Sequence, residues 1–290
     1  MKIGVVGLSL SCLNFTEFLD FVKEIGGSCI ELCTVKGAHN NTLNLTEENR
    51  VFIKEAIATR ELSIASVAGY NDFSLSDPDK IKKQVKKLQW YCRLAMDLNV
   101  NIVRVLGGDK TVDIRRKDLS KRLISGFKLA ADMAKNYNVI LALENHGYLT
   151  NEASILIEII EKVASENLKI TLDTGNFCWA GHSLQDAYNY FKILAPYTVN
   201  VHLKDFIFDG EKKVKFVPLG EGCLNLNRVI EILVLSGYNG AFLCEYEGVE
   251  DPKKLLKLGT FNEEEIIREL KKGTEKSLRY ISSILEKYDL

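Results

Sequence analysis

The sequence predicts an α/β protein with a (β/α)8 barrel, a single domain over residues 1–290, and a β-hairpin inserted after the seventh strand. Apolar runs alternate with amphipathic stretches, which is the pattern of parallel strands joined by helices. Eight such units in 290 residues fit a closed barrel better than an open doubly wound sheet. No GxGxxG motif follows the first run, so the dinucleotide-binding fold lacks its usual signature.

The eight apolar runs are the candidate strands, and helical patterns lie between them. In chain order the runs are KIGVVGLS from Lys2, CIELCT from Cys29, SIASVAGY from Ser63, NIVRVLGG from Asn101, VILALEN from Val139, LKITLD from Leu168, TVNVHLKD from Thr198 and GAFLCEYEG from Gly240. SDPDK at Ser76 and SLQD at Ser183 are typical helix starts. Asn262, followed by Glu265, predicts a capping box for the last helix, from about Phe261 to Leu285.

Composition excludes several classes of partner. The formal net charge of −1 gives no basic surplus for nucleic acid or anionic membrane. Seven cysteines without CxxC spacing indicate buried thiols in a reducing compartment rather than disulfides or a zinc cluster. The N-terminal MKIGVVGLSLSC is a first strand rather than a secretory signal, and no stretch is long enough to span a membrane. We expect a cytoplasmic protein. A homo-oligomer is one of the oligomeric states that the sequence allows.

Four polar residues stand at the ends of the last four runs, where barrel enzymes keep their chemistry. They are Glu144, Asp173, His202 and Glu245, at successive intervals of 29, 29 and 43 residues. Three clustered carboxylates repel one another unless a cation neutralises them. With one imidazole they suit Mn²⁺ or Mg²⁺, with Co²⁺ and Zn²⁺ as alternatives. Taken singly, each residue has a structural interpretation, because a histidine at a strand end can be a hydrogen-bonded structural residue and an acidic residue there can cap a helix. Together, the four residues on consecutive strands predict a metal site.

Other polar and aromatic residues near these strand ends are candidate substrate contacts. His146 lies two residues past Glu144, and its alternative is a structural role. Arg104 is either a substrate contact or a charge balance for the carboxylates. Lys204 is expected to orient His202 or the substrate.

Three further residues have similarly open roles. Glu31 on the second run could bind a hydroxyl group. Trp179 and Phe177, after Asp173, are either stacking walls for a sugar or helix-packing residues.

The long third interval contains a predicted hairpin. Its excess length falls between Asp205 and Leu224, where FIFDGEKKVKF alternates apolar and polar residues around Asp209 and Gly210. Asp-Gly between alternating runs is a strong hairpin turn signal. We predict a lid over the barrel mouth that excludes water.

Over nearly its whole length the chain resembles the sugar-phosphate isomerase/epimerase superfamily, the xylose-isomerase-like TIM barrels. The resemblance is carried by VRVLGG, LALENHG, LDTGNF, VHLKD, PLGEG and GYNGAFLCEYEG. It implies the same four metal ligands, with Glu144 and Glu245 as acid and base. Several epimerases carry a substrate-contacting histidine where this chain has Asn176, which is therefore a candidate substrate contact, and an arginine where it has FIFDG. Both departures weaken a match to the ketose 3-epimerases.

The expected function is a divalent-metal-dependent sugar isomerase or epimerase. It would transfer a proton next to the carbonyl of a small polyhydroxy ketone or aldehyde. An inosose-type dehydratase on the same metal site is the main alternative. An endonuclease IV-like phosphodiesterase is disfavoured because the chain has only four histidines and no basic surplus. A non-catalytic sugar-binding barrel is disfavoured because coordinating residues fill all four metal positions.

Overall fold

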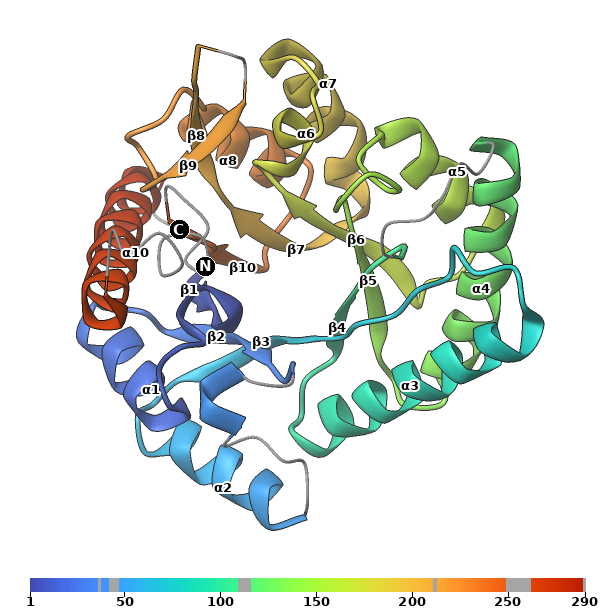
Figure 1. Cartoon of the computed structure of the whole chain (residues 1–290), viewed down its shortest axis with the longest axis horizontal. Helices are drawn as coiled ribbons and strands as arrows, with labels where there is room; N and C mark the ends of the chain where they lie inside the picture. The colour runs from blue at the N-terminus through green and yellow to red at the C-terminus, as the bar shows by residue number, and fades with distance from the viewer. Residues whose placement is uncertain (36–37, 42–46, 109–115, 211–212, 249–261, 289–290) are drawn as a thin grey trace. The chain divides into compact units, whose positions relative to one another are not determined.

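The computed structural model describes residues 1–35, 38–41, 47–108, 116–210, 213–248 and 262–288. Its strands form a closed barrel in the order β1-β10-β7-β6-β5-β4-β3-β2 (Figure 1). The strands are β1 (Lys2–Val6), β2 (Cys29–Cys33), β3 (Ser63–Ala68), β4 (Ile102–Val105), β5 (Ile140–Glu144), β6 (Leu168–Asp173), β7 (Thr198–Leu203) and β10 (Ala241–Cys244). Each lies inside one of the eight apolar runs, so the predicted fold class is confirmed.

Helices follow the strands along the chain, as the alternating pattern predicts. The α-helices are α1 (Phe15–Glu24), α2 (Glu47–Ala58), α3 (Pro78–Asp97), α4 (Arg116–Lys135), α5 (Ala153–Val163), α6 (Asn176–Trp179), α7 (Leu184–Leu194), α8 (Leu226–Leu235) and α10 (Glu263–Leu285). Short 3-10 helices are η1 (Gly7–Leu10), η2 (Ala38–Asn41), η3 (Ala195–Tyr197) and η4 (Glu286–Tyr288).

The local signals at the helix starts have the expected structural basis. Asn262 and Glu265 form the predicted capping box at the start of α10. The Ser183 hydroxyl accepts the Asp186 N–H at the start of α7. In the SDPDK stretch Asp77 is the cap, and Pro78 occupies the first turn of α3, where its missing N–H costs nothing.

The predicted hairpin is present after the seventh strand. Strands β8 (Asp205–Phe208) and β9 (Val214–Val217) pair antiparallel, from Asp205 opposite Val217 to Phe208 opposite Val214. Residues 211–212 of the connection lie outside the described residues. The role of the hairpin as a lid stays a prediction.

Contacts divide the chain into two compact units. The first comprises Met1–Ala65, His202–Glu231 and Asn239–Leu290. Within it β1 pairs in parallel with both β2 and β10, and α10 packs against β1. All five residues of β2 are buried, as expected for a parallel strand covered on both faces.

The second unit comprises Ser66–Val201 and Ile232–Tyr238. Here β4 pairs in parallel with β3 and β5, and β5 pairs with β6. Helix α4 packs between α3 and α5, as Figure 1 shows. Among the described residues no helix combines the length and apolarity needed to cross a bilayer. The single-domain organisation stays a prediction.

Candidate functional site

The four predicted metal ligands stand at the carboxyl ends of barrel strands. Glu144 is the last residue of β5, and Asp173 is the last residue of β6. His202 is the second-last residue of β7, and Glu245 directly follows β10. All four are buried, with at most 5% of the residue surface exposed. Their placement follows from the barrel, because the carboxyl ends of parallel strands share one rim.

These four residues form a group of potential metal ligands within the part of the chain that the structure describes. Each offers one oxygen or ring nitrogen, and those atoms all lie within 4.8 Å of one another. Three buried carboxylates this close carry a large electrostatic cost, which a divalent cation offsets. The donor set of three carboxylates and one imidazole fits a hard or borderline divalent ion.

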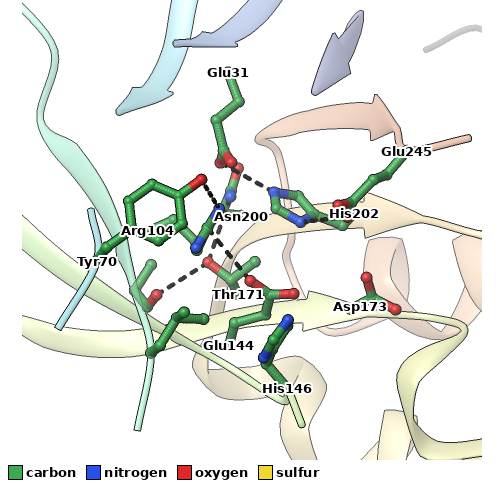
Figure 2. Close-up of polar contacts among 12 residues, drawn as sticks. Glu31, Tyr70, Arg104, Glu144, His146, Thr171, Asp173, Asn200, His202 and Glu245 are labelled. Atoms are coloured by element: carbon green, nitrogen blue, oxygen red, sulfur yellow. Dashed lines mark hydrogen bonds and ion pairs between the residues drawn. The ribbon is translucent and has the colours of Figure 1, made fainter. Parts of the chain in front are cut away.

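His202 lies between two carboxylates (Figure 2). Its Nε2 is 3.0 Å from Oε2 of Glu31, and its Nδ1 is 3.0 Å from Oε2 of Glu245. Burial by itself lowers the pKa of His202, but the charges of the two carboxylates outweigh burial and hold that pKa well above its usual range. Glu31, considered from the sequence as a hydroxyl binder, is therefore a direct partner of the histidine.

Lys204 contacts acidic residues of its own unit. Its Nζ lies 2.9 Å from Oε1 of Glu247 and 3.5 Å from Oε2 of Glu245. The same ammonium group stands 5.1 Å from the ring centroid of Phe216 on strand β9. Lys204 thus joins the end of β10 to the hairpin, and its predicted contact with substrate stays a prediction.

Asn176 links two of the ligand residues. The N–H groups of Gly175 and Asn176 donate to Oδ1 of Asp173 at 2.8 and 2.9 Å, which fixes the orientation of that carboxylate. The Asn176 side chain donates from Nδ2 to Oε1 of Glu144 at 3.2 Å. Asn176 therefore holds Glu144, and its predicted role as a substrate contact stays a prediction.

Glu144 also has a buried cation beside it. Nε of Arg104 lies 3.3 Å from Oε2 of Glu144, and both side chains are at most 4% exposed. The guanidinium stacks on Tyr70, with 4.9 Å from Cζ to the ring centroid. This geometry supports charge balance as the role of Arg104.

Asn145 is a site residue that the sequence reasoning missed. Its Oδ1 accepts the N–H of Asp173 at 2.8 Å, and its Nδ2 donates to the carbonyl oxygen of Asp173 at 2.9 Å. The amide side chain thereby extends the hydrogen bonding between β5 and β6 as far as Asp173, one of the potential metal ligands. An amide directly after Glu144 in LALENHG was the available signal.

The PLGEG stretch is organised by Asp205. Its carboxylate accepts N–H groups from Phe206, Gly220, Gly222 and Leu224, at 2.8 to 3.1 Å. Burial raises the pKa of Asp205 more than these hydrogen bonds lower it. A Cβ added at Gly222 would lie 2.0 Å from Oδ1 of Asp205, so only glycine fits there. Asp205 therefore organises the backbone of this loop.

The remaining predicted residues belong to the second unit, where they lie after β5 or on helix α6. His146 is exposed and lines a cavity of about 440 Å³, together with Tyr70, Gln84 and Tyr148. Trp179 is 42% exposed and contacts Tyr148 with ring centroids 5.2 Å apart. Phe177 is fully buried against Phe191 and other rings, so helix packing is the correct reading for it.

Known proteins of similar sequence and structure include sugar epimerases. L-ribulose-5-phosphate 3-epimerase UlaE of Escherichia coli is 25% identical over 245 residues, covering 81% of this chain and 84% of that protein. A D-tagatose 3-epimerase-like protein superposes with a TM-score of 0.75 at 21% identity, covering 99% and 100% of the two chains. The IolI protein, solved with a zinc atom, superposes with a TM-score of 0.79 at 16% identity, covering 99% of each chain.

The two structural similarities concern the fold, since their sequence identities are low. The sequence model of one family, described as xylose isomerase-like TIM barrel, matches residues 19–281. That match spans the strands that contain Glu144, Asp173 and His202, and the strand before Glu245. The chain belongs to the xylose isomerase-like TIM barrel family.

Proposed function

We propose that this protein is a divalent-metal-dependent sugar isomerase or epimerase. Its substrate is a small polyhydroxy ketone or aldehyde, and the reaction is proton transfer at the carbon next to the carbonyl. The observation that carries the proposal is the buried group of three carboxylates and one imidazole, whose ligand atoms lie within 4.8 Å of one another. The sugar epimerases among its relatives support the same reaction class.

The metal ligands in this proposal are Glu144, Asp173, His202 and Glu245. When bound, the cation supplies Lewis-acid polarisation of the carbonyl group, which acidifies the hydrogen on the neighbouring carbon. Mn²⁺ or Mg²⁺ suits the oxygen-rich donor set, while the zinc atom in the IolI protein supports Zn²⁺ as an alternative. The Asn176 side chain holds the Glu144 carboxylate, and the Asn145 side chain holds the backbone of Asp173, through the hydrogen bonds described above.

Glu144 and Glu245 are the acid and base of the proposed reaction. One carboxylate accepts the proton from carbon, and the other returns a proton. Return to the opposite face of the same carbon gives an epimer, and return to the neighbouring carbon gives an isomer. Each glutamate has one buried cation beside it, Arg104 for Glu144 and Lys204 for Glu245.

The substrate contacts in this proposal come from the exposed side of the second unit. The cavity of about 440 Å³ lined by His146 is in the range of small-ligand pockets. The Tyr148 and Trp179 rings offer apolar faces of the kind that pack against sugars. These residues bind hydroxyl groups and the carbon chain, and they carry no part of the proton transfer.

Cysteine chemistry supports a cytoplasmic location. All seven cysteines carry thiols that are not joined in disulfides, and five of them are buried. Burial raises the pKa of Cys29, Cys92 and Cys244 to about 12, which keeps these thiols protonated and unreactive at neutral pH. Abundant structural thiols suit a reducing compartment.

The test is a panel of free and phosphorylated ketoses in heavy water. The protein is stripped with EDTA and reloaded in turn with Mn²⁺, Mg²⁺, Co²⁺ or Zn²⁺, and substrates are scored for deuterium at carbon by NMR. We expect incorporation and conversion of at least one sugar only in metal-loaded protein. Loss of water from the sugar would identify the dehydratase instead. No exchange with any sugar, at full metal occupancy, would contradict the proposal.

A further inference from the structure

The strand β2 contains one carboxylate in an otherwise apolar stretch of sequence, CIELC. Glu31 is 0% exposed, and its neighbours along the strand, Ile30 and Leu32, are also fully buried. A buried carboxylate costs several kcal/mol unless a partner compensates it. Its partner is His202, which lies 171 positions away in the sequence but in the same compact unit.

The contact distinguishes the two ring nitrogens of His202. Nε2 faces Glu31 at 3.0 Å, and Nδ1 faces Glu245 at 3.0 Å (Figure 2). Glu245 belongs to the group of potential metal ligands, whereas Glu31 does not. The nitrogen on the ligand side is therefore Nδ1, and Nε2 points away from that group.

The carboxylate also selects one tautomer of the imidazole. A histidine that binds a metal must be neutral, with one N–H donor and one lone pair, and a carboxylate can only accept a hydrogen bond. A hydrogen bond to Glu31 consequently places the hydrogen on Nε2 and leaves the lone pair on Nδ1. Metal-bound histidines commonly donate their second N–H to such a carboxylate, which fixes the ring orientation and increases its basicity.

We propose that Glu31 is a positioning residue of the metal centre: it accepts the Nε2–H of His202 and so presents Nδ1 to the metal ion. This inference rests on the proposed metal site. Glu31 acts through His202 and contacts neither the metal nor the substrate. Its removal should therefore weaken metal binding and change the coordination geometry, without a separate effect on the affinity for sugar.

The experiment compares Glu31→Gln with Leu32→Ala, a matched change on the same buried strand. Metal-stripped proteins are titrated with Mn²⁺ alone by electron paramagnetic resonance, loaded with Co²⁺ for visible spectra, and melted without metal. We expect Mn²⁺ affinity to fall roughly 10- to 100-fold in Glu31→Gln, together with an altered Co²⁺ spectrum. Leu32→Ala should lower the melting temperature while binding Mn²⁺ like the wild type. Glu31→Asp, which keeps the charge, should restore part of the affinity.

The competing outcomes are distinct. Wild-type affinity and an unchanged Co²⁺ spectrum in Glu31→Gln overturn the proposal. The proposal is also overturned if Mn²⁺ affinity falls in proportion to the melting temperature in both Glu31→Gln and Leu32→Ala, because the loss of affinity is then an effect of stability. If the wild type binds no metal, the proposed function itself is wrong. If the wild type binds metal and Glu31→Gln binds it equally well, only this inference is wrong.

A measurement on the wild type avoids any dependence on variant folding. Long-range ¹H–¹⁵N NMR spectra of the Zn²⁺-loaded protein report which ring nitrogen of His202 carries hydrogen. We expect hydrogen on Nε2 and zinc on Nδ1. The reverse assignment would overturn the proposal even if every Glu31 variant failed to fold.

Discussion

The guanidinium of Arg104 lies 3.3 Å from the carboxylate of Glu144, and both side chains are buried. Such a pair is costly to break, because the surviving charge keeps its desolvation penalty without its partner. The pair therefore links the stability of the second unit to Glu144, which is proposed as an acid or base.

Arg104→Met should lower the free energy of unfolding by about 3–5 kcal/mol, since it leaves Glu144 buried without this cation. Arg104→Lys keeps the charge and should lose less. The matched control is Arg60→Met, whose partner Asp20 is 64% exposed, and a surface pair of this kind contributes about 0–1 kcal/mol. Urea unfolding measures all three. If Arg104→Met and Arg60→Met lower the free energy of unfolding equally, the buried pair contributes no more to stability than the exposed one.

The Asp205 loop gives a second prediction about stability. Gly222→Ala should be strongly destabilising, because the added Cβ would lie 2.0 Å from Oδ1 of Asp205 and displace the loop. Gly210→Ala is the control, since an added Cβ at that hairpin glycine meets no atom within 4 Å. Thermal melting should separate the two variants clearly. If Gly222→Ala has the same melting temperature as the wild type, the loop can move aside at little cost in free energy.

The strand-end positions of the four proposed metal ligands could be predicted because they depend on local patterns. Each follows an apolar run, and the repeat of one βα unit places successive run ends at the same rim. Residue type and interval therefore sufficed for Glu144 and Asp173. The hairpin was equally local, since the Asp209 and Gly210 signal lies in the connection between β8 and β9.

The partners of these residues could not be predicted, because parallel strands buried on both faces hide which side chains face each other. Glu31 and His202 lie on strands that are distant in the sequence, and no periodicity relates them. Lys204 was expected to orient His202 or the substrate, but no sequence pattern indicated that its ammonium group would lie beside Glu245 and Glu247. Side-chain direction at a strand end depends on the loops around it, which the sequence pattern does not specify.

His39 should make stability depend on pH. It is fully buried, with its ring centroid 4.9 Å from that of Phe18, and burial lowers its pKa to about 4. The unfolded chain has an ordinary histidine pKa of about 6.5, so it binds the proton more readily between these values. Stability should therefore decrease as pH falls from about 6.5 to about 4, by about 3 kcal/mol in total.

Denaturation at several pH values, in the wild type and in His39→Asn, tests this prediction. Asparagine tolerates the left-handed backbone of this position, where φ is 50°. The variant should lose much of the slope in that pH window, although its stability at pH 7 falls through lost packing. An unchanged slope would assign the pH dependence to other groups.

The hairpin should matter more for turnover than for stability. Ile207 and Phe208 are 41% and 42% exposed, whereas Asp205 and Phe206 are buried anchors. Replacing residues 208–215 by a short turn should therefore change the melting temperature little, while turnover of the substrate falls at least roughly tenfold if the hairpin excludes water. Lys213→Ala with Lys215→Ala is the control that removes charge and keeps the hairpin. Full activity after the replacement would exclude a lid.

The last prediction concerns the two proposed proton-transfer groups. Glu144→Gln and Glu245→Gln should each reduce conversion by about 10²–10⁴-fold, because glutamine keeps one ligating oxygen but cannot accept a proton at neutral pH. Glu247→Gln is the matched control, since it removes a carboxylate beside Lys204 that lies outside the ligand group. It should reduce conversion far less.

The two variants need not behave alike in half-reactions. A single remaining glutamate can exchange the substrate hydrogen with solvent on its own face while failing to complete epimerisation. In heavy water one variant should then return labelled substrate without product, and the labelled position identifies the base. Metal content must be measured first, because both residues also belong to the ligand group. Two variants that keep their metal and turn over near the wild-type rate would refute the two-glutamate mechanism, with His146 and Lys204 next to be tested as the base.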